Sequence, residues 1–184
     1  MTKVLEFQTR RLELRQWQQN DRSPFAALNA DPQVMEFFPA TLDRIQSDAM
    51  AEKIQSLITV RGWGLWAVEI KAEDPFIGFV GLHIPEPELP FGPCIEIGWR
   101  LAARYWGNGF ATEAALAALG IAFEVLQLKE VVSFTSILNQ RSQAVMQRIG
   151  MIHSGEFFEH PAIAVGDPLR THALYRIKNT LPPK

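Results

Sequence analysis

The alternation of apolar and polar residues along the chain predicts a series of β-strands. Arg11-Leu12-Glu13-Leu14-Arg15 alternates in the way that a half-buried strand does. Two β-rich runs, Trp63 to Lys71 and Phe76 to His83, are joined by the turn-prone segment 72–75 and predict a hairpin. Further strands are expected over 94–101, 131–137, 152–158 and 171–177. The prolines of the intervening loop, which exclude a central strand there, are Pro85, Pro87, Pro90 and Pro93.

A second periodicity predicts helices between these strands. Ser23-Pro24 and Asp31-Pro32 each offer a cap followed by proline, so two short helices are expected after them. The segment from Thr41 to about Val60 is expected to form a longer amphipathic helix. Its apolar face is formed by Met50, Ile54, Leu57 and Ile58.

Two more helices are predicted in the second half of the chain. One begins near Phe110 and carries an apolar stripe made of Leu116, Leu119, Phe123 and Leu126. The other is capped by Asn139 and ends at Gly150. It is expected to bury Val145, Met146 and Ile149. The resulting order of elements predicts an α/β (α+β) fold in which helices pack on a mixed sheet.

Composition narrows the class of protein. With 184 residues, 47% of them hydrophobic, the chain is expected to form a single domain over 1–184. A net charge of −2 gives no general attraction to nucleic acid or to an anionic membrane. Cys94 is the one cysteine, and no apolar run has the length of a signal peptide or a membrane span. These features predict a cytoplasmic protein.

Residues 95–113 read as a strand that runs into a glycine-rich turn and then opens a helix. Gly107 and Gly109 have no Cβ, so ligand oxygens can approach the backbone closely. The first N–H groups of the helix, from about Phe110, have no partners within the helix, and the positive end of the helix attracts phosphate. The segment therefore predicts a pyrophosphate-binding turn.

Two segments carry a family resemblance. The first is Glu96-Ile97-Gly98-Trp99-Arg100-Leu101 running into 105–114, and the second is Asn139-Gln140-Arg141-Ser142 followed by 145–151. Together they resemble the GCN5-related N-acetyltransferase (GNAT) superfamily, in particular its ribosomal-protein alanine and serine N-acetyltransferases. The resemblance implies a mostly antiparallel sheet with one splayed pair of strands. It also implies transfer of acetyl from acetyl-CoA to a primary amine, either a protein N-terminal α-amine or the amine of a small molecule.

The superfamily signature, Gln/Arg-x-x-Gly-x-Gly/Ala, fits this chain in two registrations. The helix start favours Trp106, Gly109 and Ala111, and a second match begins at Arg104. By the resemblance, backbone of the Trp99 strand pairs with the pantetheine amides and Asn139 bonds the pantetheine arm. The full set of expected cofactor contacts is Trp99, Arg100, Leu101, Arg104, Trp106, Gly107, Asn108, Gly109, Phe110, Ala111, Thr112, Asn139 and Ser142.

Acetyl transfer needs an uncharged amine and a donor for the developing oxyanion. Glu96, on the strand expected to meet the thioester, is the first candidate base, and backbone N–H near Trp99 is the candidate oxyanion donor. Met146 stands where many superfamily members place a general-acid tyrosine. The substitutes considered are Ser142, one turn earlier, and Tyr175, which matches less well by position. His160 and His172 are candidates on the substrate side.

Other interpretations stay open. Glu96 can be a paired strand carboxylate, Asn139 an N-cap alone, and the two late histidines core residues. Because Met146 replaces the usual general acid, a non-catalytic CoA-binding sensor is an alternative function. A dinucleotide-binding oxidoreductase would use Glu130, but Thr112 stands where its third glycine belongs.

The remaining expectations concern partners. Four histidines and one cysteine show no metal spacing, so no metal is predicted. The segments 31–38 and 161–168 are expected to recognise the acceptor. The protein is expected to be a monomer or a homodimer, and to bind neither nucleic acid nor membrane.

Overall fold

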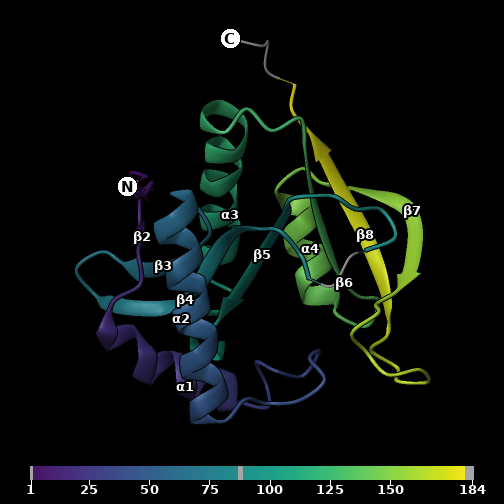
Figure 1. Cartoon of the computed structure of the whole chain (residues 1–184), viewed down its shortest axis with the longest axis horizontal. Coiled ribbons are helices and arrows are strands. Elements are labelled where there is room, and N and C mark those ends of the chain that lie inside the picture. The colour runs from purple at the N-terminus through teal and green to yellow at the C-terminus, as the bar shows by residue number, and fades with distance from the viewer. Residues whose placement is uncertain (1, 87–88, 181–184) are drawn as a thin grey trace.

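The computed structural model describes residues 2–86 and 89–180, and its centre is an eight-stranded sheet (Figure 1). The strands are β1 Phe7–Gln8, β2 Leu12–Arg15, β3 Leu65–Ile70, β4 Asp74–His83, β5 Glu96–Leu101, β6 Glu130–Ser136, β7 Ile152–Glu159 and β8 Thr171–Lys178. They lie in the order β1-β2-β3-β4-β5-β6-β8-β7. Neighbouring strands are antiparallel except β5 and β6, which are parallel. The mixed sheet and its predicted strands are confirmed, and β1 is an addition. Pro87 lies outside the described residues, and the described parts of the proline loop form no strand.

Four α-helices flank the sheet, and Figure 1 shows α2 lying across β3 and β4. Their bounds are α1 Arg22–Ala30, α2 Arg44–Arg61, α3 Phe110–Gly120 and α4 Gln140–Arg148. Asp43 caps α2 in a capping box with Gln46, and Asn139 caps α4 by accepting from Ser142 N. A π-helical turn (η3, Ile121–Val125) extends α3.

Three predictions about helices are wrong. Asp21, not Ser23, stands at the N-cap position of α1. Asp31-Pro32 opens a series of turns, not a helix, because only six residues separate Pro32 from Pro39 and the residue before a proline disfavours helical backbone. In α3, Leu116 is exposed while the helix buries alanines, which allow a close approach to the sheet. The buried residues of α3 are Ala114, Ala115, Ala118 and Leu119.

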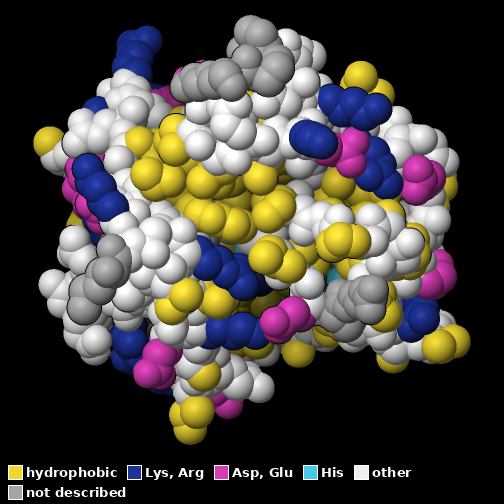
Figure 2. All heavy atoms as spheres, turned by 45° about the horizontal axis from the view of Figure 1, so that its top comes forward, with side chains coloured by type: hydrophobic (Ala, Val, Ile, Leu, Met, Phe, Trp, Pro, Cys, Tyr) yellow, Lys and Arg dark blue, Asp and Glu magenta, His cyan; other side chains and the backbone are white. Residues whose placement is uncertain are grey.

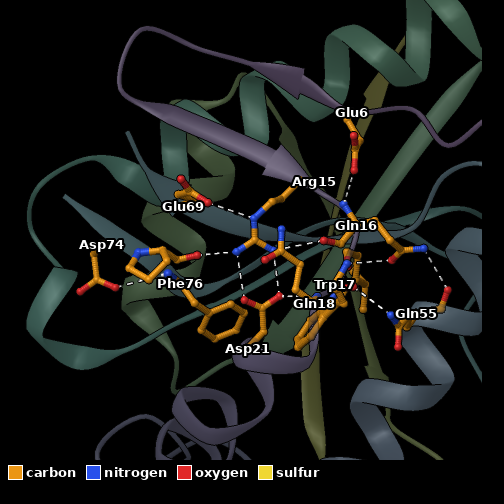
Figure 3. Close-up of polar contacts among 12 residues, drawn as sticks. Glu6, Arg15, Gln16, Trp17, Gln18, Asp21, Gln55, Glu69, Asp74 and Phe76 are labelled. Atoms are coloured by element: carbon orange, nitrogen blue, oxygen red, sulfur yellow. Dashed lines mark hydrogen bonds and ion pairs between the residues drawn. The ribbon is translucent and has the colours of Figure 1, made fainter. Parts of the chain in front are cut away.

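A buried arginine fixes the entry to α1 (Figure 3). Arg15 of β2 forms two hydrogen bonds to Asp21, of 2.8 and 3.0 Å, in a short 3₁₀ turn (η1, Gln19–Asp21). Its Nε donates to Glu69 at 3.0 Å, and its guanidinium also reaches the backbone oxygens of Gln16 and Pro75. A buried guanidinium is stable when its N–H groups are paired in this way. The Arg15 cluster therefore ties β2, β3 and α1 together.

Candidate active site

The parallel pair β5 and β6 separates after a single rung. Glu96 of β5 is in register with Val132 of β6, and Val132 N donates to Ile95 O at 2.9 Å. Ser133 Oγ then donates to Ile97 O at 2.9 Å, which places the odd-numbered backbone groups of β5 on the side facing β6. No strand pairs with Trp99 on that side within the described residues. The structure thus contains a splayed strand pair with open backbone groups along β5.

The glycine turn lies at the end of this splayed strand. Gly107 and Gly109 both have φ of +78°, the left-handed region that glycine adopts without strain. A Cβ built on Gly107 would meet no atom within 4 Å, so space is open above the turn. The first bond within α3 runs from Glu113 N to Gly109 O at 3.0 Å. The N–H groups of the three preceding residues therefore have no partner within the helix.

A cluster of bonds to Glu113 fixes the start of α3. Arg11 Nε and Thr9 Oγ1 both donate to this carboxylate at 2.6 Å, and Arg11 N donates at 2.9 Å. Arg11 Nη1 also donates to Asn108 O at 3.0 Å. These bonds hold the turn against the loop between β1 and β2. Burial opposes ionisation of Glu113, but the Thr9 and Arg11 bonds outweigh it and lower its pKa.

Two aromatic residues of the turn face different partners. Trp106 Nε1 donates to Leu101 O at 2.8 Å, so this carbonyl, one of the groups expected to pair with pantetheine, already has a partner. The guanidinium of Arg141, at the start of α4, stacks on Trp106 at 4.7 Å from the ring centroid. Arg104 points elsewhere and pairs with Asp74 at 3.2 Å, as does the Tyr105 hydroxyl. The structure thus brings α4 to the glycine turn and leaves the Arg104 side chain outside it.

Alternate residues place Glu96, Gly98 and Arg100 on one face of β5. Glu96 Oε2 lies 2.9 Å from Nε2 of His83, its neighbour on β4. Glu96 Oε1 and His83 Nε2 each lie 4.0 Å from the position that a Cβ on Gly98 would take. Burial disfavours the charged imidazole, yet the charge and the hydrogen bond of Glu96 outweigh it and raise the pKa of His83. The missing side chain at Gly98 leaves space beside an acid–imidazole pair.

The late histidines form part of an aromatic cluster on β6, β7 and β8. The rings of His160 and His172 lie 4.9 Å apart, and Phe134 and Phe158 pack beside both. Burial lowers the pKa of His172 to about 4. Burial also lowers the pKa of His160, while the charge of Glu96 acts in the opposite direction. His160 is therefore within electrostatic reach of Glu96, whereas His172 is a buried neutral residue.

The start of α4 contains the remaining candidates. Asn139 Oδ1 accepts from Ser142 N at 3.1 Å, so the N-cap role of Asn139 is confirmed. Met146 is 1% exposed, and no hydroxyl stands in its place. Tyr175 is buried and its hydroxyl contacts Gln143 and Gln147 of α4 at 3.3 and 3.4 Å. Ser142 is thus the hydroxyl that lies at the exposed end of α4.

Figure 2 shows one face on which hydrophobic side chains gather at the centre and basic and acidic side chains border a shadowed hollow. Among the described residues there is no group of three or more His, Cys, Asp or Glu arranged to hold a metal ion. Over the same residues, no helix has the length and apolarity of a membrane span.

The splayed strands and the glycine turn match a known family. The model of the Acetyltransferase (GNAT) domain matches residues 11–152. The chain belongs to the GNAT acetyltransferase family. It is an N-acetyltransferase that uses acetyl-CoA. Glu130, the alternative dinucleotide contact, forms an ion pair with Arg176 at 2.8 Å.

Relatives and solved structures agree with this assignment. The chain is 32% identical over 157 residues to the FsC-acetyl coenzyme A-N(2)-transacetylase of Aspergillus fumigatus, covering 82% of this chain and 66% of that protein. An acetyltransferase from Agrobacterium tumefaciens superposes with a TM-score of 0.75 at 26% identity, over 96% of each chain. The spermidine N-acetyltransferase of Vibrio cholerae, solved with CoA and spermine, gives a TM-score of 0.71 at 19% identity, over 93% of this chain and 97% of that one.

Two residues of the site were not found from the sequence as functional. His83 stood in a β-rich run with nothing to indicate that it faces Glu96 across the hairpin. Arg100 was assigned through its backbone alone, and its buried side chain depends on contacts with α1 that no local pattern reveals.

Proposed function

We propose that this acetyltransferase acetylates a primary α-amine, over Gly98, with Glu96 as general base. The observation that carries the proposal is that Glu96 and His83 both lie 4.0 Å from the side-chain position that Gly98 leaves empty, on the strand whose pairing with β6 ends there. An α-amine with a pKa near 8 costs about 1.4 kcal/mol to deprotonate at pH 7, whereas a lysine amine costs roughly 4.6 kcal/mol. A single carboxylate hydrogen-bonded to histidine is better matched to the first task.

The fit of acetyl-CoA depends on the glycine turn and the open edge of β5. Left-handed glycines, unpaired N–H groups at the start of α3 and empty space above Gly107 suit the two linked phosphates. Gly107 and Gly109, the two glycines of this turn with positive φ, both belong to the signature registration that begins at Arg104. Their conformation supports that registration in addition to the one that begins at Trp106. When bound, acetyl-CoA supplies the acetyl group as a thioester.

Residues of this chain would divide the remaining work as follows. Glu96 accepts a proton from the amine, and His83 holds the carboxylate in place at 2.9 Å. The N–H of Trp99, on the open edge of β5, is the proposed donor to the oxyanion. Ser142 positions water or donates a proton at the exposed end of α4. Because a thiol has a pKa near 8.5, thiolate can leave without a strong acid, which is consistent with Met146.

The acceptor would enter between two loops. One is the turn segment 31–43, and the other is the late loop near Pro161, where a cavity of about 450 Å³ is lined by Leu89, Pro90, Gly92, Glu159 and Pro161. His160 lies beside this region and is proposed to contact the acceptor. A cytoplasmic location, the absence of a metal, and kinship with the ribosomal-protein branch are further parts of the proposal.

A thiol-release assay with acetyl-CoA tests the proposed function. The acceptors are a panel of N-terminal peptides and polyamines, and mass spectrometry locates the acetyl group. We expect turnover with α-amines, with lysine side chains reacting more slowly. Acetyl-CoA binding without turnover of any amine would support a sensor in place of the proposed transferase.

A further inference from the structure

The second buried arginine of this fold lacks the partners that the first one has. Arg100 is 9% exposed, and its Nη1 donates to Asn29 Oδ1 at 2.6 Å. Its Nε is buried without any hydrogen-bond partner. Within the described residues no carboxylate forms an ion pair with it, whereas Arg15 binds two. A buried cation without an anion is costly, so such a group calls for a functional explanation.

The surroundings of Arg100 are aromatic and neutral. Its guanidinium lies 4.1 Å from the ring centroid of Phe38 and 5.5 Å from that of Phe79. Asn29 Nδ2 donates a hydrogen bond to Ser47 Oγ at 2.9 Å, so the partner that follows Asn29 is a neutral hydroxyl and not a carboxylate. Burial lowers the pKa of Arg100 to about 10, which leaves it a cation at neutral pH. The positive charge therefore remains uncompensated in the free protein.

Three acidic side chains of this region form ion pairs, and Asp31 and Asp43 of the turn segment accept hydrogen bonds from Gln33 N and Gln46 N. Glu96 is bound to His83, Glu36 to Arg141, and Glu159 to Arg170. A site that recognises a polyamine needs free carboxylates to balance two or more ammonium groups. Here the buried charge that lacks a counterion among the described residues is the guanidinium of Arg100.

The position of Arg100 relates it to the proposed acceptor site. Glu96, Gly98 and Arg100 lie on one face of β5, and Arg100 comes four residues after Glu96, or about 13 Å along the strand. Phe38, which covers the guanidinium, belongs to the turn segment 31–43 and is 36% exposed. An acceptor amine beside Glu96 can therefore extend over Gly98 and place a second group beside Arg100 when Phe38 moves aside.

We propose that Arg100 recognises an anionic group of the acceptor, so that the substrate is an amine carrying a carboxylate or similar anion two or three residues from the reacting nitrogen. This inference depends on the proposed acetylation over Gly98. An enzyme with this role for Arg100 acetylates acidic peptides or similar small molecules in preference to polyamines.

The test compares acceptors that differ in one charge. The peptide amides Ala-Glu-Ala and Ala-Ala-Glu are assayed against Ala-Gln-Ala and Ala-Ala-Gln, with spermidine as a third class. A hydrogen-bonded ion pair is worth about 1.5 kcal/mol or more, so kcat/KM should favour a Glu peptide over its Gln partner by at least about tenfold. Most of the difference should lie in KM of the acceptor.

Variants connect the preference to Arg100. Arg100→Met should reduce the Glu-over-Gln preference to about twofold or less. Arg100→Lys keeps the charge and should retain part of the preference. Arg44→Met, which removes an exposed arginine of α2, is the matched control and should leave it unchanged. Thermal unfolding followed by circular dichroism verifies that each variant folds.

The outcomes separate the two proposals. Equal rates for Glu and Gln peptides, a preference that survives Arg100→Met, or spermidine as the best acceptor would overturn the role of Arg100 while acetyl transfer stands. Binding of acetyl-CoA without turnover of any amine would overturn the proposed function, and the inference with it.

Discussion

At the scale of single residues, the proposed chemistry depends on a carboxylate that has a partner. Glu96 is not an isolated base, because His83 lies 2.9 Å from it and has a raised pKa. The imidazole holds the carboxylate in place through this contact. Loss of the His83 proton frees Glu96 to accept one from the amine, so the pair is expected to control the pH dependence of the reaction.

Glu96→Gln is expected to lower kcat by about a hundredfold or more at neutral pH, the usual range for loss of a general base. The amide keeps the size of the side chain, so the affinity for acetyl-CoA measured by calorimetry should change little. Unchanged turnover would remove Glu96 from the mechanism.

His83→Gln is expected to change the pH profile. In the wild type, kcat/KM should rise with an apparent pKa above the ordinary value of 6.5, because burial of His83 is outweighed by Glu96. The variant lacks this titration, so its rise should move to lower pH. The same acceptor is used for both proteins, so the ionisation of its amine contributes equally to both pH profiles. Superimposable profiles would exclude His83 from this role.

His172 affects stability instead. Its folded pKa of about 4 lies below the ordinary 6.5, so the unfolded chain binds more protons below pH 6.5. Stability from this residue is present above pH 6.5 and is lost as the pH falls towards 4. Between pH 7 and pH 5 the wild type should lose roughly 2 kcal/mol more than His172→Gln, measured by urea unfolding. An equal loss in both proteins would contradict the account.

At the scale of elements, the glycine turn and α3 act as one unit. Two left-handed glycines turn the chain, and three bonds to Glu113 hold the first turn of the helix in place. The N–H groups at that helix start can face a ligand because the turn is fixed from behind. Cofactor affinity should therefore depend on backbone conformation more than on any side chain of the turn.

Gly109→Ala tests this dependence. A residue with a Cβ at φ of +78° costs about 1–2 kcal/mol, so the variant should be less stable and should bind CoA roughly tenfold more weakly by calorimetry. Gly120, in α3, has right-handed backbone and open space at its Cβ position, which makes Gly120→Ala the control. The control should keep its CoA affinity and gain a few tenths of a kcal/mol. Equal CoA affinity in both variants would contradict the model of the turn.

The sequence predicted most elements because alternation and helical periodicity report local burial. It failed after Asp31, where Pro39 leaves no room for a helix after Pro32, and where Phe37 and Phe38 contact arginines from distant elements. These contacts run from Arg141 to Phe37 and from Arg100 to Phe38. It also failed at Leu116, since the buried face of α3 is formed by three alanines and Leu119. Contacts between distant segments have no signature within a single window of sequence.

The site was predictable to the same extent. The glycine turn and Glu96 belong to continuous motifs, so they were found. His83 and the Arg100 side chain become functional only through pairing of β4 with β5 and packing of α1, which the sequence does not reveal.

At the scale of the whole molecule, the sheet consists of two antiparallel halves joined through β5 and β6. The junction is one rung, reinforced by the bond from Ser133 to Ile97. A sheet that separates so early exposes backbone groups on both strands, and a ligand that bridges them should couple the halves. CoA is expected to raise the melting temperature and to slow amide exchange on both sides of the gap.

Ser133→Ala removes the reinforcing bond. Ser133 is 2% exposed, so the variant should lose about 1 kcal/mol because Ile97 O loses a buried donor. Amide exchange measured by mass spectrometry should increase at β5 and β6 before it increases at β3 and β4. Uniform exchange across the sheet would show that the junction is not its weak point.

The structure of a CoA complex would show whether the glycine turn and the splayed strands hold the cofactor. We expect pyrophosphate oxygens within hydrogen-bond distance of the backbone nitrogens of 107–112, and the pantetheine arm between β5 and β6 with its thiol directed towards Gly98. A complex in which CoA binds elsewhere, or in which β5 and β6 close together and leave the turn empty, would contradict it.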